Sequence, residues 1–146
     1  MWARPNQSSN SIGNLIVHLT GNVSEWILGG IGGRSVTRFR AGEFAQTDGA
    51  DGSKLLDNLE AVLSEADAIL AGLTEKDLER SLVIQDRETT VLSAVYHVVE
   101  HFSMHTGQII LLAKADQPDR VRFYELVDGH PRLTAEFHGR TPIHPR

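Results

Sequence analysis

The chain has 146 residues, 40% hydrophobic and 23% charged, which is typical of one globular domain. It contains no cysteine, which excludes a disulfide scaffold, an iron–sulfur cluster, a cysteine nucleophile and a cysteine-ligated zinc site. A net charge of −5 argues against nucleic-acid binding, and no apolar run approaches the roughly 18 residues that cross a bilayer. The polar N-terminal segment lacks the apolar core of a secretory signal. We therefore expect a cytoplasmic protein with neither a nucleic-acid nor a membrane partner.

The first predicted helix covers residues 9–28, where apolar side chains recur every three or four positions, as they do on one face of a helix. Ser8, Ser9 or Asn10 can supply its N-cap oxygen. Two glycine pairs, residues 29–30 and 32–33, follow the apolar pattern, and glycine is the usual residue just past a helix end. The sequence therefore predicts that the helix stops at these glycines.

Residues 34–52 are predicted to form a loop that carries Arg34, Arg38 and Arg40. These three arginines could bind an anionic ligand, although a solvated loop is the favoured interpretation. A second helix is predicted from Ser53 to a glycine at position 72, because its leucines recur with helical spacing. A capped turn is expected immediately after it, over residues 74–77.

The next apolar run, residues 82–84, indicates either a short strand or an extended linker. A third long helix is predicted over residues 90–114, since its length is improbable for a strand. The remaining segment, residues 115–146, holds four of the five prolines and is expected to be mostly irregular. Together the elements predict an all-α bundle in a single domain over residues 1–146.

Three of the seven histidines, His97, His101 and His105, follow one another at steps of four on the third predicted helix. Each step rises about 6 Å and turns about 40°, so a neighbouring pair can present two imidazoles to one metal ion. The outer two lie about 12 Å apart, which is too far for one ion. The helix thus offers two ligands, from either neighbouring pair, and a third ligand must come from elsewhere.

His18, in the middle of the first predicted helix, is the candidate for the third ligand. Its row and the His101 row each flank the apolar stripe of their helix, so the two rows can face each other across a cleft. They can also both face solvent, in which case the chain is a helical interaction module without a metal. The other three histidines are expected at the surface, at positions His130, His138 and His144.

The stretch from His97 to His101 also matches H-x-x-E-H, the inverted zincin motif, in which a glutamate acts as general base. The sequence predicts no long strand that could align a peptide beside such a site. A peptidase is therefore disfavoured, and Glu100 is interpreted as a solvated residue or as a partner of a ligand.

Two segments together resemble the DinB superfamily, most closely its uncharacterised small bacterial branch, over about residues 2–128. They are NSIGNLIVHL at residues 10–19 and HFSMHTGQ at residues 101–108. The resemblance implies a DinB-like helical bundle of the up-down four-helix type, often dimeric, with a divalent metal bound by three histidines. Carried over by motif, these ligands are His18, His101 and His105, which leaves His97 as a flanking residue.

Characterised members of the superfamily include bacillithiol and mycothiol transferases and a mycothiol-dependent maleylpyruvate isomerase. The resemblance therefore implies a metal-dependent enzyme that acts on a small-molecule substrate, with thiol-dependent S-transferase or hydrolase-like chemistry. Zn²⁺ or Ni²⁺ is the expected ion, because three neutral imidazoles leave coordination positions open for a water or a low-molecular-weight thiol. The candidates for proton transfer are His97, Glu100 and Gln108, which are chosen only because they lie close to the expected ligands in the sequence. The alternative is a non-catalytic, stress-associated metal-binding dimer.

Superfamily members usually begin with a helix that precedes the first histidine-bearing helix, and this helix is expected to be missing here. An apolar groove should then remain on the bundle. We expect a second protomer or the C-terminal segment to cover it, and a homodimer is the expected assembly.

Overall fold

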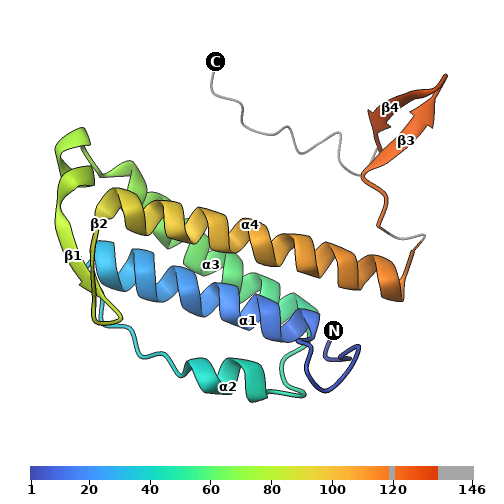
Figure 1. Ribbon diagram of the computed structural model, residues 1–146, viewed down its shortest axis with the longest axis horizontal. Coiled ribbons are helices and arrows are strands. Elements are labelled where there is room, and N and C mark those ends of the chain that lie inside the picture. Colours follow the sequence, from blue (N-terminus) through green and yellow to red (C-terminus); the bar gives the residue numbers. More distant parts are fainter. Residues whose placement is uncertain (119–120, 135–146) are drawn as a thin grey trace. The chain divides into compact units, whose positions relative to one another are not determined.

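The computed structural model describes residues 1–118 and 121–134, and the chain forms two compact units, Met1–Ile109 and Ile110–Arg146 (Figure 1). In chain order the elements are α1 (Ile12–Val23), the π-helix η1 (Ser24–Ile31), α2 (Arg40–Ala45), α3 (Gly52–Ala71), the 3-10 helix η2 (Glu75–Glu79), β1 (Ser81–Ile84), β2 (Arg87–Thr90), α4 (Val91–Asp116), β3 (Tyr124–Val127) and β4 (His130–Leu133).

The fold is mostly helical, but it is not strictly all-α as expected, because two antiparallel hairpins accompany the four α-helices of the described residues. In the first hairpin, Ser81 of β1 pairs with Thr90 of β2, which makes the predicted apolar run a strand. Both hairpins turn through two residues with positive φ. Asp128-Gly129 is a hairpin signal that a sequence can show, whereas Gln85-Asp86 is not. Neither hairpin is predicted as a unit above, although the second one carries this signal.

The first helix starts later and ends later than expected. The hydroxyl of Ser11 accepts a hydrogen bond from the Asn14 backbone N–H at 3.1 Å, and the Asn14 side chain accepts one from the Ser11 N–H, which forms a capping box. Of the two glycine pairs predicted to stop the helix, the first lies inside η1, so the expected end at residue 28 is wrong, while the second pair directly follows the observed end at Ile31. The Ile84 side chain occupies the space that a Cβ on Gly30 would need, so glycine here permits close packing. The helix ends where Gly33 adopts a φ of +68°.

The expected loop over residues 34–52 contains a helix, α2, whose ends depend on tertiary contacts. The Asn14 side-chain amide donates to the backbone carbonyls of Glu43 at 2.8 Å and Gln46 at 2.7 Å. The Arg4 guanidinium donates to the carbonyls of Phe44 and Gln46. A six-residue helix has no periodic apolar pattern to reveal it, and these distant donors satisfy its terminal carbonyls.

The predicted second and third long helices are confirmed as α3 and α4, each within two residues of its expected bounds, and Thr74 caps η2 in the predicted turn. Helices η1, which continues α1, and α4 supply most of the apolar core of the first unit, to which α1, α3 and the hairpin each add one buried residue. Its buried members are Val23, Trp26, Ile27, Leu28, Ile31, Ala66, Ile84, Val91, Ala94 and Val98. Figure 1 shows α1, α3 and α4 running alongside one another. The core therefore fixes α1 and α4 as neighbours, which positions their polar flanks.

The second unit contains the end of α4 and the hairpin β3–β4, in which Tyr124 pairs with Leu133. The Lys114 ammonium lies 5.4 Å from the centre of the Phe123 ring. The expectation of a mostly irregular segment is therefore wrong for the hairpin, which its Asp-Gly turn directs. His130 is exposed, as predicted, while His138 and His144 lie outside the described residues, as does the rest of the prediction for 135–146.

An apolar groove with a volume of about 380 Å³ opens between η1, α3 and α4 in the first unit. Its lining includes Ile27, Leu63, Leu70, Val99 and Phe102. No helix is present in residues 1–11, so none precedes α1 there. Among the described helices, none has the length and apolar character needed to cross a membrane.

Candidate metal centre

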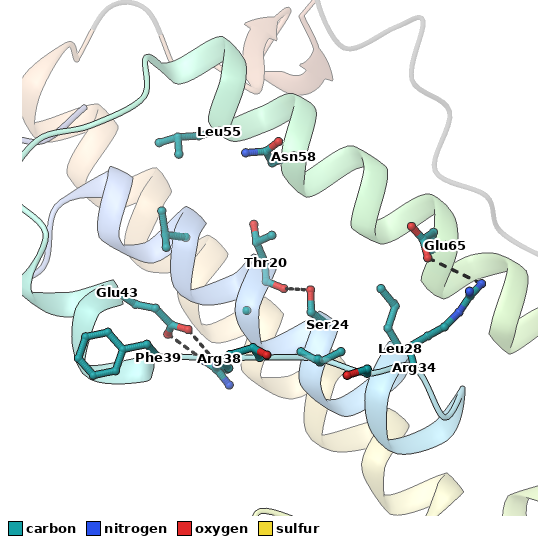
Figure 2. Close-up of a pocket in the computed structure, with 15 residues that line it drawn as sticks. Thr20, Ser24, Leu28, Arg34, Arg38, Phe39, Glu43, Leu55, Asn58 and Glu65 are labelled. Carbon is teal, nitrogen blue, oxygen red and sulfur yellow. Dashed lines mark hydrogen bonds and ion pairs between the residues drawn. The ribbon is translucent and has the colours of Figure 1, made fainter.

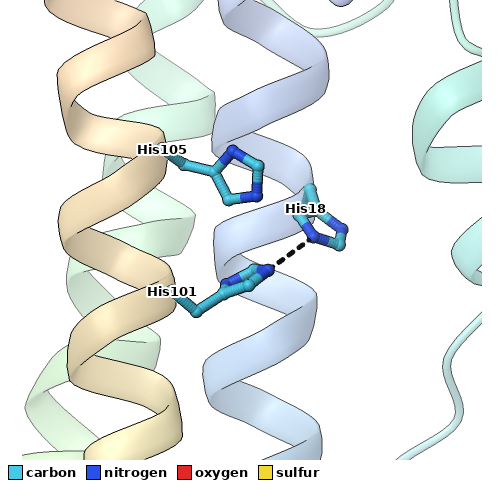
Figure 3. Close-up of side chains that lie close together, drawn as sticks. All are labelled: His18, His101 and His105. Carbon is cyan, nitrogen blue, oxygen red and sulfur yellow. Dashed lines mark hydrogen bonds between the residues drawn. The ribbon is translucent and has the colours of Figure 1, made fainter.

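Three imidazoles from two helices converge in the first unit (Figure 3). His18 comes from α1, while His101 and His105 come from successive turns of α4. Each residue offers one nitrogen, and the three nitrogens lie within 4.8 Å of one another. The Nε2 atoms of His18 and His101 are 3.0 Å apart. The structure thus brings together the three histidines predicted as ligands.

The spacing of one pair of these nitrogens, on His18 and His101, already suits a shared ion. Zinc–imidazole bonds of about 2.0–2.1 Å, at angles of about 90–110°, place two ligand nitrogens about 2.9–3.4 Å apart. The 3.0 Å between the Nε2 atoms of His18 and His101 falls within this range. Without an ion, one of the two nitrogens carries a proton that it donates to the other. Three imidazole donors are also a ligand set that suits Zn²⁺ and Ni²⁺.

Hydrogen bonds orient two of the three rings. His18 Nδ1 lies 2.7 Å from Oε2 of Glu43, and His105 Nδ1 lies 2.8 Å from Oε1 of Gln108. When each Nδ1 donates, the lone pair stays on Nε2, where a ligand needs it. The buried Nδ1 of His101 has no such partner in the part of the chain that the structure describes.

Burial disfavours the protonated form of two of the three imidazoles, those of His18 and His101. His18 and His105 are buried, and His101 is half-buried. Burial lowers the pKa of His18, although the hydrogen bond and the charge of Glu43 oppose this. Burial also lowers the pKa of His101 to about 4, assisted by the neighbouring His105, His18, His97 and Arg38. Neutral imidazoles are the form that binds a metal ion.

The metal-free protein is expected to lose stability as the pH falls from about 6.5 to about 4. The pKa of His101 is about 4 in the folded chain and 6.5 in the unfolded chain, so between these values only the unfolded chain binds the proton. The free energy of unfolding therefore decreases as the pH falls through this window, and the lowered pKa values of His18 and His97 act in the same direction. Urea unfolding in the presence of a chelator measures this dependence.

The variant His101→Gln, which does not titrate, is the control for this measurement and should show a flatter pH dependence. A wild-type free energy of unfolding that stays constant across the window would contradict the expectation.

Behind His18, a network of charges contradicts the interpretation of residues 34–52 as a solvated loop. The side chain of Arg38 is 6% exposed and donates to both carboxylate oxygens of Glu43, at 2.6 and 2.9 Å. It also donates to Oε2 of Glu25 at 2.7 Å. The other two arginines are exposed, as expected: Arg34 lies 4.0 Å from a carboxylate and Arg40 near a phenylalanine ring.

Hydrogen bonds hold Glu43 in its charged form. Burial raises the pKa of this carboxyl, but the hydrogen bonds from Arg38 and His18 outweigh burial and lower it. Sequence reasoning missed Glu43, because a lone acidic residue in an apparent loop carries no pattern. The position of Glu43 beside His18 follows from the packing of α2 against α1, which the sequence pattern does not show.

A cavity of about 550 Å³ lies between α1, α3 and residues 34–39, with Glu43 and Arg38 in its wall (Figure 2). Thr20 of α1 and Ser24 of η1 face Asn58 of α3 across it. None of the three clustered histidines lines this cavity or the apolar groove. This cavity therefore adjoins the network behind His18, and the three clustered histidines are not part of its wall.

The remaining candidates lie beside the cluster. The ring of His97 packs against Trp26, with ring centres 4.0 Å apart, and His97 is not among the three converging residues. Glu100 is exposed, while Gln108 contacts His105. The structure therefore does not assemble the inverted zincin pair of His97 and His101 as a binding site.

The fold and the site define a mostly helical protein in which three histidines could hold a metal ion. The chain belongs to the DUF1572 family, described as a protein of unknown function, whose family model matches residues 1–128. Comparisons with curated proteins and with solved structures found no match.

Proposed function

We propose that this protein is a DinB-like, divalent-metal-dependent enzyme in which His18, His101 and His105 bind Zn²⁺ or Ni²⁺. The convergence of these imidazoles, with nitrogens within 4.8 Å of one another, is the observation that carries the proposal. The match to the DUF1572 family over residues 1–128 supports it, since that match spans the region of the DinB resemblance.

The proposed chemistry is thiol-dependent S-transfer or a hydrolase-like reaction on a small molecule. A divalent cation, when bound, supplies Lewis acidity and lowers the pKa of a coordinated water or thiol. The chain itself supplies three imidazoles, two of them held by Glu43 and Gln108, and a half-buried site. Of the neighbours nominated for proton transfer, Gln108 is engaged with His105 and Glu100 is exposed. His97, half-buried on the same helix, is the remaining candidate.

One observation favours a second candidate function, a non-catalytic, stress-associated metal-binding protein. Neither the 550 Å³ cavity nor the apolar groove is lined by the three histidines, so neither leads a substrate to them. In this function the ion joins α1 to α4 and stabilises the fold.

Metal analysis and turnover assays separate these functions. Protein purified without a histidine tag is expected to contain stoichiometric Zn²⁺ or Ni²⁺ by elemental analysis. The loaded protein is then assayed with low-molecular-weight thiols and model electrophiles, and with ester and amide substrates. Turnover that a chelator abolishes supports the enzyme, whereas bound metal that raises the Tm without turnover supports the second function. A chain that binds no divalent metal would overturn both.

We further propose a cytoplasmic homodimer. The apolar groove between η1, α3 and α4 supports this assembly, because a second protomer could cover exposed side chains such as Val99. Analytical ultracentrifugation is expected to show a dimer, and a monodisperse monomer would contradict it.

A further inference from the structure

The three candidate ligands differ in the hydrogen-bond partner of their Nδ1 atoms. His18 Nδ1 lies 2.7 Å from a carboxylate oxygen of Glu43, whereas His105 Nδ1 lies 2.8 Å from the neutral amide oxygen of Gln108. The buried Nδ1 of His101 has no hydrogen-bond partner in the described ranges. Only His18 is therefore supported by an ionised group. A carboxylate behind a ligating histidine fixes the ring and makes its other nitrogen a stronger donor to a metal.

Glu43 is itself held by Arg38. The Arg38 guanidinium donates to both of its carboxylate oxygens, a bidentate pair that fixes the plane of the carboxylate. Arg38 is in turn held by Glu25 at 2.7 Å, and Glu25 accepts a hydrogen bond from Gln85 at 2.6 Å. Gln85 lies in the hairpin turn with a φ of +53°. A chain of contacts from Gln85 through Glu25 to Arg38 thus holds the Glu43 carboxylate in place beside His18.

Helix α1 is also shaped to receive Glu43. Asn14, one helical turn before His18, donates to the backbone carbonyl of Glu43 and so holds α2 in place. At Gly21, a Cβ would collide with the Glu43 carboxylate and with Arg38, so the absence of a side chain leaves room for the pair. The same helix therefore provides the ligand, the contact that holds α2 and the space for the carboxylate.

We propose that Glu43, clamped by Arg38, is a positioning residue that makes His18 the strongest of the three ligands for a divalent cation such as Zn²⁺. This inference rests on the proposed function, because it requires the three histidines to bind a metal. Glu43 does not touch the ion. It holds the Nδ1 proton of His18 and directs Nε2 toward His101.

The variant Glu43→Gln tests this role, because it keeps the shape of the side chain and removes its charge. Its affinity for Zn²⁺, measured by competition with a chromophoric chelator, is expected to fall about 10- to 100-fold. Its Co²⁺ complex is expected to show a shifted visible absorption spectrum, which a purely structural role would not produce. Far-UV circular dichroism of the metal-free variant checks its fold. If that variant does not fold, Glu43→Asp, which keeps the charge and shortens the reach to Nδ1, is expected to show the same loss.

Glu65→Gln is the matched control, because Glu65 is an exposed carboxylate that lies 4.0 Å from Arg34 and takes no part in the contacts behind His18. Its Zn²⁺ affinity and Co²⁺ spectrum are expected to remain those of the wild type. An unchanged affinity and spectrum in the Glu43 variants, or an equal loss in Glu65→Gln, would overturn the inference while leaving the proposed metal site intact. A wild-type protein that binds no Zn²⁺ would instead overturn the proposed function, and this inference with it.

Discussion

Replacing His101 by alanine is expected to lower the affinity for Zn²⁺ or Ni²⁺ by more than about a hundredfold, which exceeds the usual cost of losing an outer-shell partner. The ring centre of His101 lies 4.8 Å from that of His18 and 4.5 Å from that of His105, and the latter two centres are 5.1 Å apart, so the three rings form a compact triangle. Without His101, only two imidazoles remain to bind the ion, one on α1 and one on α4. Isothermal titration calorimetry with each ion measures the loss, and the metal-induced rise in Tm should disappear in parallel.

His97→Ala is the matched control, because His97 lies one turn earlier on α4 and outside the cluster. Its affinity for the metal is expected to remain close to that of the wild type. If His97→Ala lost as much affinity as His101→Ala while His105→Ala lost little, the ligands would be the other neighbouring pair, and the proposed site would be wrong.

Replacing Arg38 by methionine is expected to lower the free energy of unfolding by about 3–5 kcal/mol, the usual cost of removing one partner of a buried ion pair. Arg38 and Glu43 are 6% and 7% exposed, so the Glu43 carboxylate would stay buried with His18 as its remaining side-chain partner. Glu25 would lose the same partner, but it is 28% exposed and keeps Gln85. Urea unfolding of the metal-free protein measures the change.

Two further variants make this measurement specific. Arg34→Met removes an exposed arginine from the same segment and is expected to change stability by no more than about 0.5 kcal/mol. The double variant Arg38→Met with Glu43→Met is expected to recover much of the loss, since two apolar side chains can replace a buried pair. An Arg38→Met effect as small as that of Arg34→Met would contradict the buried network.

The helical periodicity of the chain was enough to place α1, α3 and α4, and the steps of four between His97, His101 and His105 showed that α4 could offer two ligands. These are local properties, because spacing along a helix determines which side chains share a face. The hairpin of β1 and β2 and the short helix α2 were missed for the corresponding reason. Their stability comes from contacts with distant segments, such as Asn14, and not from a pattern of their own.

The partners of each histidine depended on the tertiary structure. The sequence offered His18 as a third ligand but left open whether its row faced α4 or solvent, and packing of the core brings its Nε2 to 3.0 Å from that of His101. Nothing in the sequence pattern linked Arg38 or Glu43 to His18, because such a link is a contact between side chains from separate segments. Helix periodicity is repeated locally and can be read from one chain, whereas a buried charge network forms only where the fold brings its members together.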